Sequence, residues 1–462
     1  MTVLALLSAI LAQSAPPAAT NPATPPAMRG TSTLVPPPFV PDVGADPARP
    51  GQSTGALPPP YLPGARQFLI QPGQTWKHVL EDIEPGDEIV FPPGFHVPQE
   101  IDGLAGTRER PIILRSRDRV PAAVVCGEFG WKFRRARHVI VENMMFLNPT
   151  GAAIVVEGAP GETAPWTAEV TIRNCTIAGN RPSEGQDAVR LDRVSDVRLD
   201  KLRIDGWVDS AVEIESSRRV LVRAAMLVPP DTALPACGIK VLGTSGEISV
   251  TGCAFNKRLR TGVSVGTPRS AADAAPRPVE RMRIDRCIFE DPGTAVRIAN
   301  ARDLVISRAT VVNPTDAIYA VADDAVTVEK VLVEKCLGYW TPGMLAKFSP
   351  HPDGIAPTGV SLADNLWYSR ELPEAWEVLG APFGVQLSGQ VTTLDPGIDA
   401  STLKPRNGEA IRYGAFSMAA TSGGRKPENP ADPAEPLPMQ PGAGPAAAAP
   451  GPSAPQSPPA PR

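Results

Sequence analysis

Apolar and polar residues follow an eight-residue pattern that recurs along the middle of the chain. It reads apolar, any, apolar, any, any, small or apolar, any, apolar, and its first copy is Val139–Phe146. Seven further copies, the last of them weaker, start at Val170, Val197, Val220, Ile248, Met282, Leu304 and Val331. Successive copies start 22 to 34 residues apart. A repeat of this length predicts stacked supersecondary units, none of which buries its apolar face alone.

A second, four-residue pattern follows most copies of the first: Ala or Gly, then Val or Ile, any residue, and an aliphatic residue. It occurs at Ala188–Leu191, Ala211–Ile214, Gly238–Val241, Gly262–Val265 and Ala295–Ile298, and in looser form at Ala153–Val156 and Ala317–Ala320. Both patterns alternate apolar and polar residues with a period of two, which indicates half-buried strands. Two or three short strands per repeat describe one coil of a parallel β-helix. We therefore predict an all-β, right-handed parallel β-helix.

Proline divides the chain into a folded middle and two tails. Most of the 55 prolines lie near the two ends, in stretches that are also rich in Ala, Gly and Ser. Such stretches bury too little apolar surface to offset chain entropy, which predicts disorder. The expected organisation is a signal peptide at 1–15, a disordered segment at 16–65, one β-helix domain at 66–416 (N-terminal cap 66–84, coils 85–340, C-terminal cap 341–416) and a disordered tail at 417–462.

The first fifteen residues, Met1–Ala15, form an apolar run that ends in small residues, which predicts a secretory signal peptide. This run is too short to span a membrane, and no later stretch reaches about 18 consecutive apolar residues. We therefore expect a secreted, periplasmic or cell-surface protein without a transmembrane segment in the mature chain.

Charge and cysteine usage argue against a nucleic-acid-binding protein and against a disulfide-bonded or metal-binding one. The chain has 45 basic and 49 acidic residues, and no basic stretch is interleaved with aromatic residues, so a nucleic acid partner is not expected. Four of the six cysteines occupy the sixth position of the eight-residue pattern: Cys175, Cys253, Cys287 and Cys336. A small side chain there is expected to point inward, so we interpret these residues as core rather than as disulfides or metal ligands.

A helix is predicted ahead of the first coil. Trp76, Val79, Leu80 and Ile83 share one helical face, and Thr75 before them is a candidate N-cap. Because the end of a β-helix leaves a sheet edge and core side chains uncovered, we expect this helix to cap it.

The two segments after this helix, Pro85–His96 and Gly106–Ser116, have glycine and proline at their corners. They resemble the opening coils of the pectate-lyase-like superfamily, nearest the chondroitinase B and alginate lyase-like polysaccharide lyases. Val139–Phe146 is similar to the recurring first strand of that group. The resemblance covers roughly residues 66–340 and implies a right-handed parallel β-helix and a polysaccharide substrate. The catalytic motifs of the group are not matched in this chain.

The third residue of the four-residue pattern is expected to point out of the coil, because its neighbours point inward. Since coils stack about 4.8 Å apart, these residues should form an outward column. From first coil to last, the predicted column is Val155, Arg190, Glu213, Lys240, Ser264, Arg297 and Tyr319. The same face adds Glu157, Asp192 and Glu215 further along the strands, and Asp187, Ser210, Thr261, Thr294 and Asp316 ahead of them.

This wall has two interpretations. It is either a solvated sheet face with alternating charges, or the site of a lyase that cleaves a uronate-containing glycan by β-elimination. In a lyase, Arg190 or a calcium ion would neutralise the sugar carboxylate, and Lys240 would act as base if a nearby cation lowered its pKa. We predict Lys240, Arg190 and Glu213 as catalytic residues, Asp187, Ser210, Arg297 and Tyr319 as substrate-binding residues, and Asp192 and Glu215 as metal ligands.

Two other functions stay open. Glu213 and Glu215 lie two residues apart on one strand face, with backbones about 6.6 Å apart. This is near the separation of about 6.5–9.5 Å between the carboxyl groups of inverting glycoside hydrolases. A non-catalytic glycan-binding or structural cell-surface protein is the other alternative. In each case we expect an acidic polysaccharide as partner and a monomeric protein.

Overall fold

The computed structural model describes residues 62–118, 120–158, 167–179, 187–230, 236–267, 277–321, 325–340, 348–349, 358–370 and 385–417. The predicted signal peptide at 1–15, nearly all of the segment 16–65 and all but one residue of the tail 417–462 lie outside the described residues. Within the described part of the chain, no helix is long and apolar enough to cross a membrane.

The described strands form three sheets, here called A, B and C. Sheet A has the order β1 (Gln67–Leu69), β2 (Glu88–Phe91), β5 (Ile112–Ser116), β8 (Arg137–Glu142), β11 (Ala168–Arg173), β14 (Arg198–Asp200), β17 (Leu221–Arg223), β20 (Ser249–Thr251), β23 (Val279–Asp285), β26 (Asn300–Ser307), β29 (Thr327–Glu334), β32 (Thr358–Ala363) and β34 (Val385–Ser388). Sheet B has the order β3 (Phe95–His96), β6 (Ala122–Val125), β9 (Met144–Leu147), β12 (Thr176–Ala178), β15 (Arg203–Asp205), β18 (Met226–Val228), β21 (Ala254–Phe255), β24 (Ile288–Glu290), β27 (Thr310–Val312), β30 (Leu337–Trp340) and β33 (Leu366–Ser369). Sheet C has the order β4 (Gln99–Asp102), β7 (Trp131–Arg134), β10 (Ile154–Glu157), β13 (Val189–Asp192), β16 (Ser210–Glu215), β19 (Cys237–Leu242), β22 (Thr261–Val265), β25 (Thr294–Ile298), β28 (Ala317–Val321) and β31 (Phe348–Ser349).

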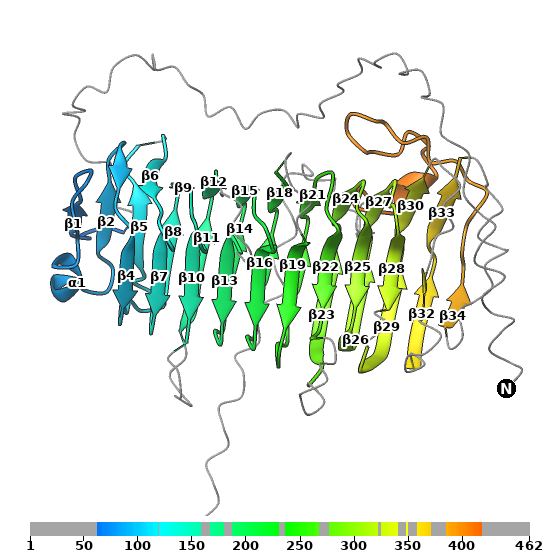
Figure 1. Ribbon diagram of the computed structural model, residues 1–462, viewed down its shortest axis with the longest axis horizontal. Helices are drawn as coiled ribbons and strands as arrows, with labels where there is room; N and C mark the ends of the chain where they lie inside the picture. Colours follow the sequence, from blue (N-terminus) through cyan, green and yellow to red (C-terminus); the bar gives the residue numbers. More distant parts are fainter. Residues whose placement is uncertain are drawn as a thin grey trace, which may run out of the picture. The chain divides into compact units, whose positions relative to one another are not determined.

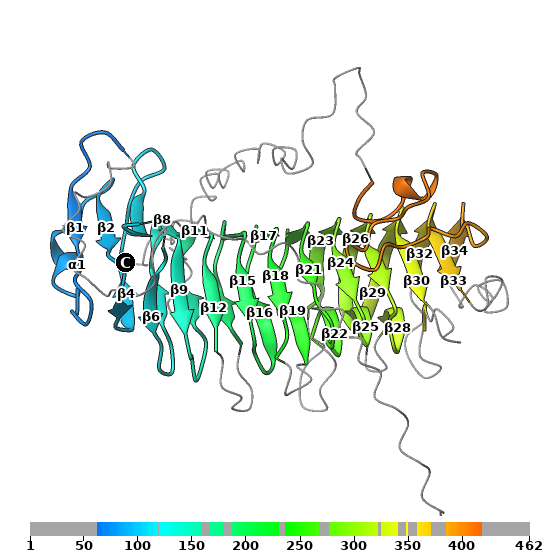
Figure 2. The same ribbon diagram turned by 90° about the horizontal axis from the view of Figure 1, so that it is seen from above.

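The chain visits the sheets in the order A, B, C once per coil, and every strand pairs in parallel with the strand of the same sheet in the next coil (Figure 1). For example, β8, β9 and β10 make one coil, and β11 returns to sheet A beside β8. Figure 2 shows the same stacking of successive coils from a second side. The predicted all-β parallel β-helix is confirmed, and with it the scaffold that the resemblance to the pectate-lyase-like superfamily implied.

The eight-residue pattern covers two strands and the corner between them. In its first copy, Val139 and Val141 of β8 and Met144 and Phe146 of β9 are fully buried. Asn143 between them has a φ of 55°, which turns the chain from sheet A to sheet B in one residue. This left-handed conformation recurs at Asn143, Asn174, Lys201, Ala224, Gly252, Arg286, Arg308, Lys335 and Asp364. Since the corner residue points to solvent and its neighbours point inward, the pattern repeats in every coil.

The cysteine column lies in the core as predicted. All six cysteines are buried free thiols. At the start of the sheet B strands, Cys253 and Cys287 occupy equivalent positions in consecutive coils. Burial raises the pKa of the Cys175 and Cys336 thiols to about 12, which makes them unreactive.

Trp76 lies near the N-terminal end of the β-helix core. This side chain is fully buried and packs edge-on against Phe91 and Trp131, with ring centroids 5.6 and 5.8 Å away. The helix after it is shorter than predicted: α1 spans only Val79–Asp82, and His78 rather than Thr75 stands at its N-cap. The reason is that the Val79 N–H bonds to the Trp76 carbonyl, an i to i+3 turn that seats the indole in the core before the helix begins.

Stacked strands extend beyond both predicted limits of the coils, since β1 precedes residue 85 and β32 to β34 follow residue 340. Trp367 of β33 is a core residue that packs edge-on against Tyr319, with ring centroids 6.0 Å apart. The last segment, which includes a 3₁₀ turn at Ala410–Arg412, covers the outer face of sheet B at β27 and β30 (Figure 1, orange).

Candidate functional site

Strand register brings the predicted column together on the outer face of sheet C. Val155, Arg190, Glu213, Lys240, Ser264 and Arg297 pair in that order on β10, β13, β16, β19, β22 and β25. The inward neighbours of each residue are buried aliphatic side chains, which fixes the outward direction of the column. Charged groups up to 107 residues apart in sequence, Arg190 and Arg297, thereby share one face.

The prediction for Tyr319 is wrong. Tyr319 pairs with the inward residue Val296, and Ala320 takes the place opposite Arg297. Its side chain is 2% exposed and lies inside the coil, so it cannot bind substrate. The cause is a slip of one residue: Ile318, Tyr319 and Ala320 are all apolar, so the alternation that fixed the other strands is ambiguous here.

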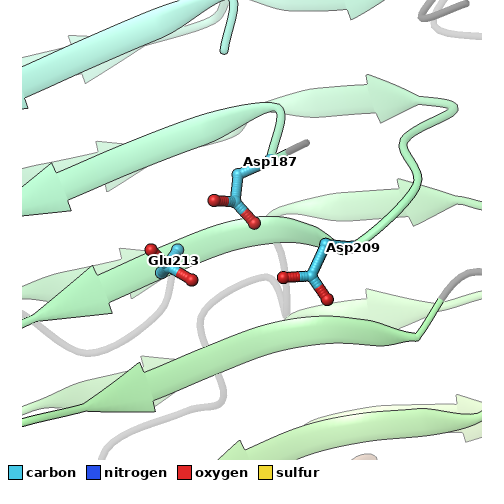
Figure 3. Close-up of side chains that lie close together, drawn as sticks. All are labelled: Asp187, Asp209 and Glu213. Carbon is cyan, nitrogen blue, oxygen red and sulfur yellow. The ribbon is translucent and has the colours of Figure 1, made fainter. Parts of the chain in front are cut away.

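Three carboxylates meet beside the start of β16. Asp187, Asp209 and Glu213 each offer an oxygen, and these oxygens all lie within 4.8 Å of one another (Figure 3). Asp187 precedes β13, Asp209 directly precedes β16, and Glu213 belongs to the outward column. Among the described residues this is the one such group of His, Cys, Asp or Glu side chains, and we call it the acidic cluster.

Sequence reasoning did not find Asp209, because it precedes the strand and stands outside the four-residue pattern. Two buried interactions place it. The Trp207 indole N–H donates to the Cys237 carbonyl at 2.7 Å, and the Cys237 N–H donates to the Asp209 carbonyl at 2.8 Å. The adjacent buried tryptophan was the available signal, since a large aromatic residue in a short corner implies a fixed turn.

Lys240 supplies the cation of this cluster. Its ammonium donates to Asp209 Oδ2 at 2.8 Å and lies 3.1 Å from Glu213 Oε2. Burial disfavours the charged ammonium, but the hydrogen bond to Asp209 and the charge of Glu213 outweigh it, so the pKa of Lys240 is raised. This is opposite to the lowered pKa on which the role of Lys240 as a base depended, because carboxylates rather than cations surround the ammonium.

The position of Asp187 disfavours its ionised form. Burial, followed by the charge of Glu213, raises its pKa from 3.8 to about 7. Ser210 opposes this shift: its backbone N–H donates to Asp187 Oδ1 at 3.2 Å, and its hydroxyl donates to the same oxygen. Ser210 is fully buried, so its contact is with Asp187 and not with a molecule outside the coil.

The remaining predicted site residues surround the acidic cluster. Arg190 lies 3.7 Å from both Glu213 and Glu215, and about half of its side chain is exposed. Asp192 pairs directly opposite Glu215 but forms an ion pair with Arg193 at 2.8 Å. Asp192 and Glu215 as metal ligands and Arg297 as a substrate-binding residue stay predictions.

The donor set of the acidic cluster suits a hard cation. Carboxylate oxygens are the ligands that calcium prefers, and calcium takes six to eight of them. The three side chains present would supply part of that shell. Lys240 holds two of the three carboxylates, so a bound cation would take over the role of the ammonium.

No protein-family model matches the chain, and neither does any curated protein. Solved structures with a similar fold include the PL6 family alginate lyase AlyGC, 15% identical with a TM-score of 0.43; the match covers 75% of this chain and 56% of that lyase. A mannuronic acid specific family 6 lyase from human gut microbiota is 15% identical over 71% of this chain and 83% of its own, with a TM-score of 0.46. The Streptococcus pneumoniae surface protein and adhesin PfbA is 14% identical over 68% and 83%, with a TM-score of 0.43. Both enzymes and an adhesin are thus similar at this level, and the similarity does not choose between them.

Proposed function

We propose that the protein acts outside the cytoplasm on an acidic, uronate-containing polysaccharide, as a lyase whose site is the acidic cluster with Lys240 and Arg190. One observation carries the proposal. Asp187, a carboxyl group with a raised pKa, lies within 4.8 Å of Asp209 and Glu213, and these two carboxylates bind the ammonium of Lys240. The four residues come from three successive coils on the outer face of the β-helix. Perturbed acid and base groups that converge in this way are typical of functional sites.

The two cations have the role of binding the sugar carboxylate. β-Elimination removes the proton from the carbon beside that carboxylate, and neutralising the carboxylate makes this proton more acidic. Arg190 is half-exposed, so its guanidinium is open to a ligand. Lys240 stays charged because Glu213 and Asp209 stabilise its ammonium.

Asp187 is the base in this proposal. A carboxyl with a pKa of about 7 is partly ionised at neutral pH and accepts a proton more readily than an ordinary aspartate. It would take the proton from the sugar carbon beside the carboxylate. A carbon–carbon double bond would form as the bond from the neighbouring carbon to the glycosidic oxygen breaks, and the leaving oxygen would take up a proton from water. A calcium ion held by Asp209 and Glu213 would take over this neutralising role from Lys240.

The test is the release of unsaturated uronates, followed by ultraviolet absorbance, from alginate, pectate, hyaluronan and chondroitin sulfates. Each substrate is offered with calcium and with a chelator. We expect product from one class of substrate, and Asp187→Asn should lower its rate at least 100-fold. Asp200→Asn is the matched control, because this carboxylate belongs to the coil of Asp209 but lies on sheet A, where it pairs with Arg223.

The alternatives give different results in the same samples. Release of reducing sugar without an unsaturated product would show that the protein is a glycoside hydrolase and not a lyase. Binding without any product would make the acidic cluster a structural ion network on a glycan-binding wall. Equal activity in Asp187→Asn and Asp200→Asn would contradict the assignment of the base.

A further inference from the structure

A separate hollow lies at the corner between sheets C and A, beyond the far ends of β16 and β19. Its volume is 260 Å³, and arginines dominate its lining. Its wall consists of Arg218, Thr244, Ser245, Gly246, Arg277, Pro278, Glu280, Arg281 and Arg302. The volume is below the range of about 300–1,000 Å³ for pockets that take drug-sized ligands, so it fits one charged group or ring.

Gly246 opens the hollow. Arg218, Gly246, Glu280 and Arg302 lie opposite one another on four consecutive coils. At the second of these positions there is no side chain, which leaves a gap between Arg218 and Glu280. A Cβ at Gly246 would stand 3.3 Å from the Glu280 carbonyl oxygen, so even the smallest side chain would crowd the gap.

The charges around the hollow do not cancel. Arg281 pairs with Glu247 at 2.8 Å, and Arg302 is shared between Glu280 at 3.5 Å and Glu329 at 2.8 Å. Arg218 and Arg277 are exposed, and no carboxylate of the described residues forms an ion pair with either guanidinium. Two positive groups in a concave site without acidic partners favour an anion.

We infer that this hollow binds an anionic group of a glycan, a sulfate ester or a carboxylate, through Arg218 and Arg277. Guanidinium groups match both anions because they donate two parallel hydrogen bonds. The assignment to a glycan rests on the proposed function, whereas the anion site rests only on the geometry of the corner.

The hollow and the acidic cluster lie at opposite ends of one strand. Asp209 directly precedes β16, and Arg218 follows its last residue by three positions. The six residues of β16 span about 20 Å. A polysaccharide that crosses sheet C along this strand would therefore have its charges held at both ends of the crossing.

The experiment is calorimetric titration of the full chain with two hexasaccharides, one heparin-derived and sulfated, the other a non-sulfated oligouronate. The double variant Arg218→Gln/Arg277→Gln should raise the dissociation constant of at least one of them tenfold or more. Arg198→Gln is the matched control: Arg198 is an exposed arginine of sheet A without an ion pair among the described residues, and it should change the constant less than twofold. The two sugars separate sulfate from carboxylate as the anion that is held.

Equal binding by the double variant and by Arg198→Gln would overturn the inference. Single-stranded DNA of matched charge provides the test of ligand class: if it binds as tightly and depends on the same two arginines, the site is not a glycan site. Each titration is repeated with Asp187→Asn. Binding that survives in this variant and is lost in the arginine variant supports the hollow even if no polysaccharide is cleaved.

Discussion

The ionisation of Asp187 depends on its neighbours in the folded chain. In the sequence it is one of several acidic residues near the outward column. In the folded chain it is 8% exposed, lies beside Glu213, and accepts two hydrogen bonds from Ser210. Burial and the second carboxylate disfavour its ionised form, and neither could be read from the residue type.

The raised pKa of Asp187 predicts a dependence of stability on pH. Because this pKa is about 7 in the folded chain and 3.8 ordinarily, the unfolded chain releases the proton first as pH rises. The free energy of unfolding of the wild type should therefore fall relative to that of Asp187→Asn between about pH 4 and pH 7, by at most roughly 1.4 kcal/mol per pH unit. Above about pH 7 the difference between the two should stay constant. Urea unfolding from pH 4 to pH 8 measures this difference.

Ser210→Ala provides the control for this pH dependence. This substitution removes the hydroxyl whose hydrogen bond lowers the pKa of Asp187, so the loss of stability should extend to higher pH. Parallel stability curves for wild type and Asp187→Asn would contradict the raised pKa.

At the scale of strands, the choice between Gly and Ala in the four-residue pattern follows the size of a neighbouring side chain. A Cβ at Gly130, Gly238 or Gly262 would stand 2.5–2.8 Å from the ring of Phe146, Phe255 or Phe289, respectively. Each phenylalanine lies on the sheet B strand of the coil that follows its glycine. Where that position holds Ile177, Ile204, Leu227 or Val311, the matching residues are Ala153, Ala188, Ala211 and Ala295. A large side chain on sheet B therefore faces a small one on sheet C of the preceding coil, and the two together fill the space between neighbouring coils.

Gly262→Ala should lower the free energy of unfolding by about 1–3 kcal/mol, because the added methyl overpacks against Phe289. Phe289→Val in the same chain should recover part of the loss. Recovery is partial because the new Cβ would also stand 2.5 Å from the Ala295 carbonyl oxygen. Chemical denaturation of the two single variants and the double variant gives the coupling energy.

Gly127→Ala is the control for this cycle, since nothing lies within 4 Å of a Cβ at that position. Additive effects of Gly262→Ala and Phe289→Val would show that the ring does not determine the choice of glycine.

At the scale of the whole β-helix, each coil pairs only with the coils before and after it. Arg198 lies opposite Leu221, and Arg203 lies opposite Met226, so one coil here is 23 residues long (221 − 198 = 23). A repeat architecture of this kind is stabilised by contacts between neighbouring coils. Both candidate sites depend on this one coil, because Asp209, Glu213 and Arg218 belong to it.

Deletion of residues 198–220 should therefore leave a folded β-helix without either site. Leu221 would take the place of Arg198, and β13 would pair with β19. We expect circular dichroism per residue to be retained, unfolding to stay cooperative at a lower midpoint, and hexasaccharide binding to be lost. Deletion of 198–221 is the control, since one further residue shifts the register and turns inward side chains outward. Equal folding of both deletions would contradict the dependence on register.

The repeat, the coil of short parallel strands, the inward cysteines and most of the outward column were determined by the sequence itself. The reason is local: alternation with period two and a one-residue corner are imposed on each coil by its own residues. Tyr319 marks the limit of this reasoning, because three consecutive apolar residues leave the register open.

Only the tertiary structure decided how the corners meet. Asp209 joins the acidic cluster because Trp207 and Cys237 fix a turn outside the repeating pattern. The pKa of Lys240 rises rather than falls because its nearest charges are the carboxylates of Asp209 and Glu213. Gly246 opens a hollow because of the side chains above and below it in other coils. Each of these depends on distances between coils, which a pattern along one chain does not contain.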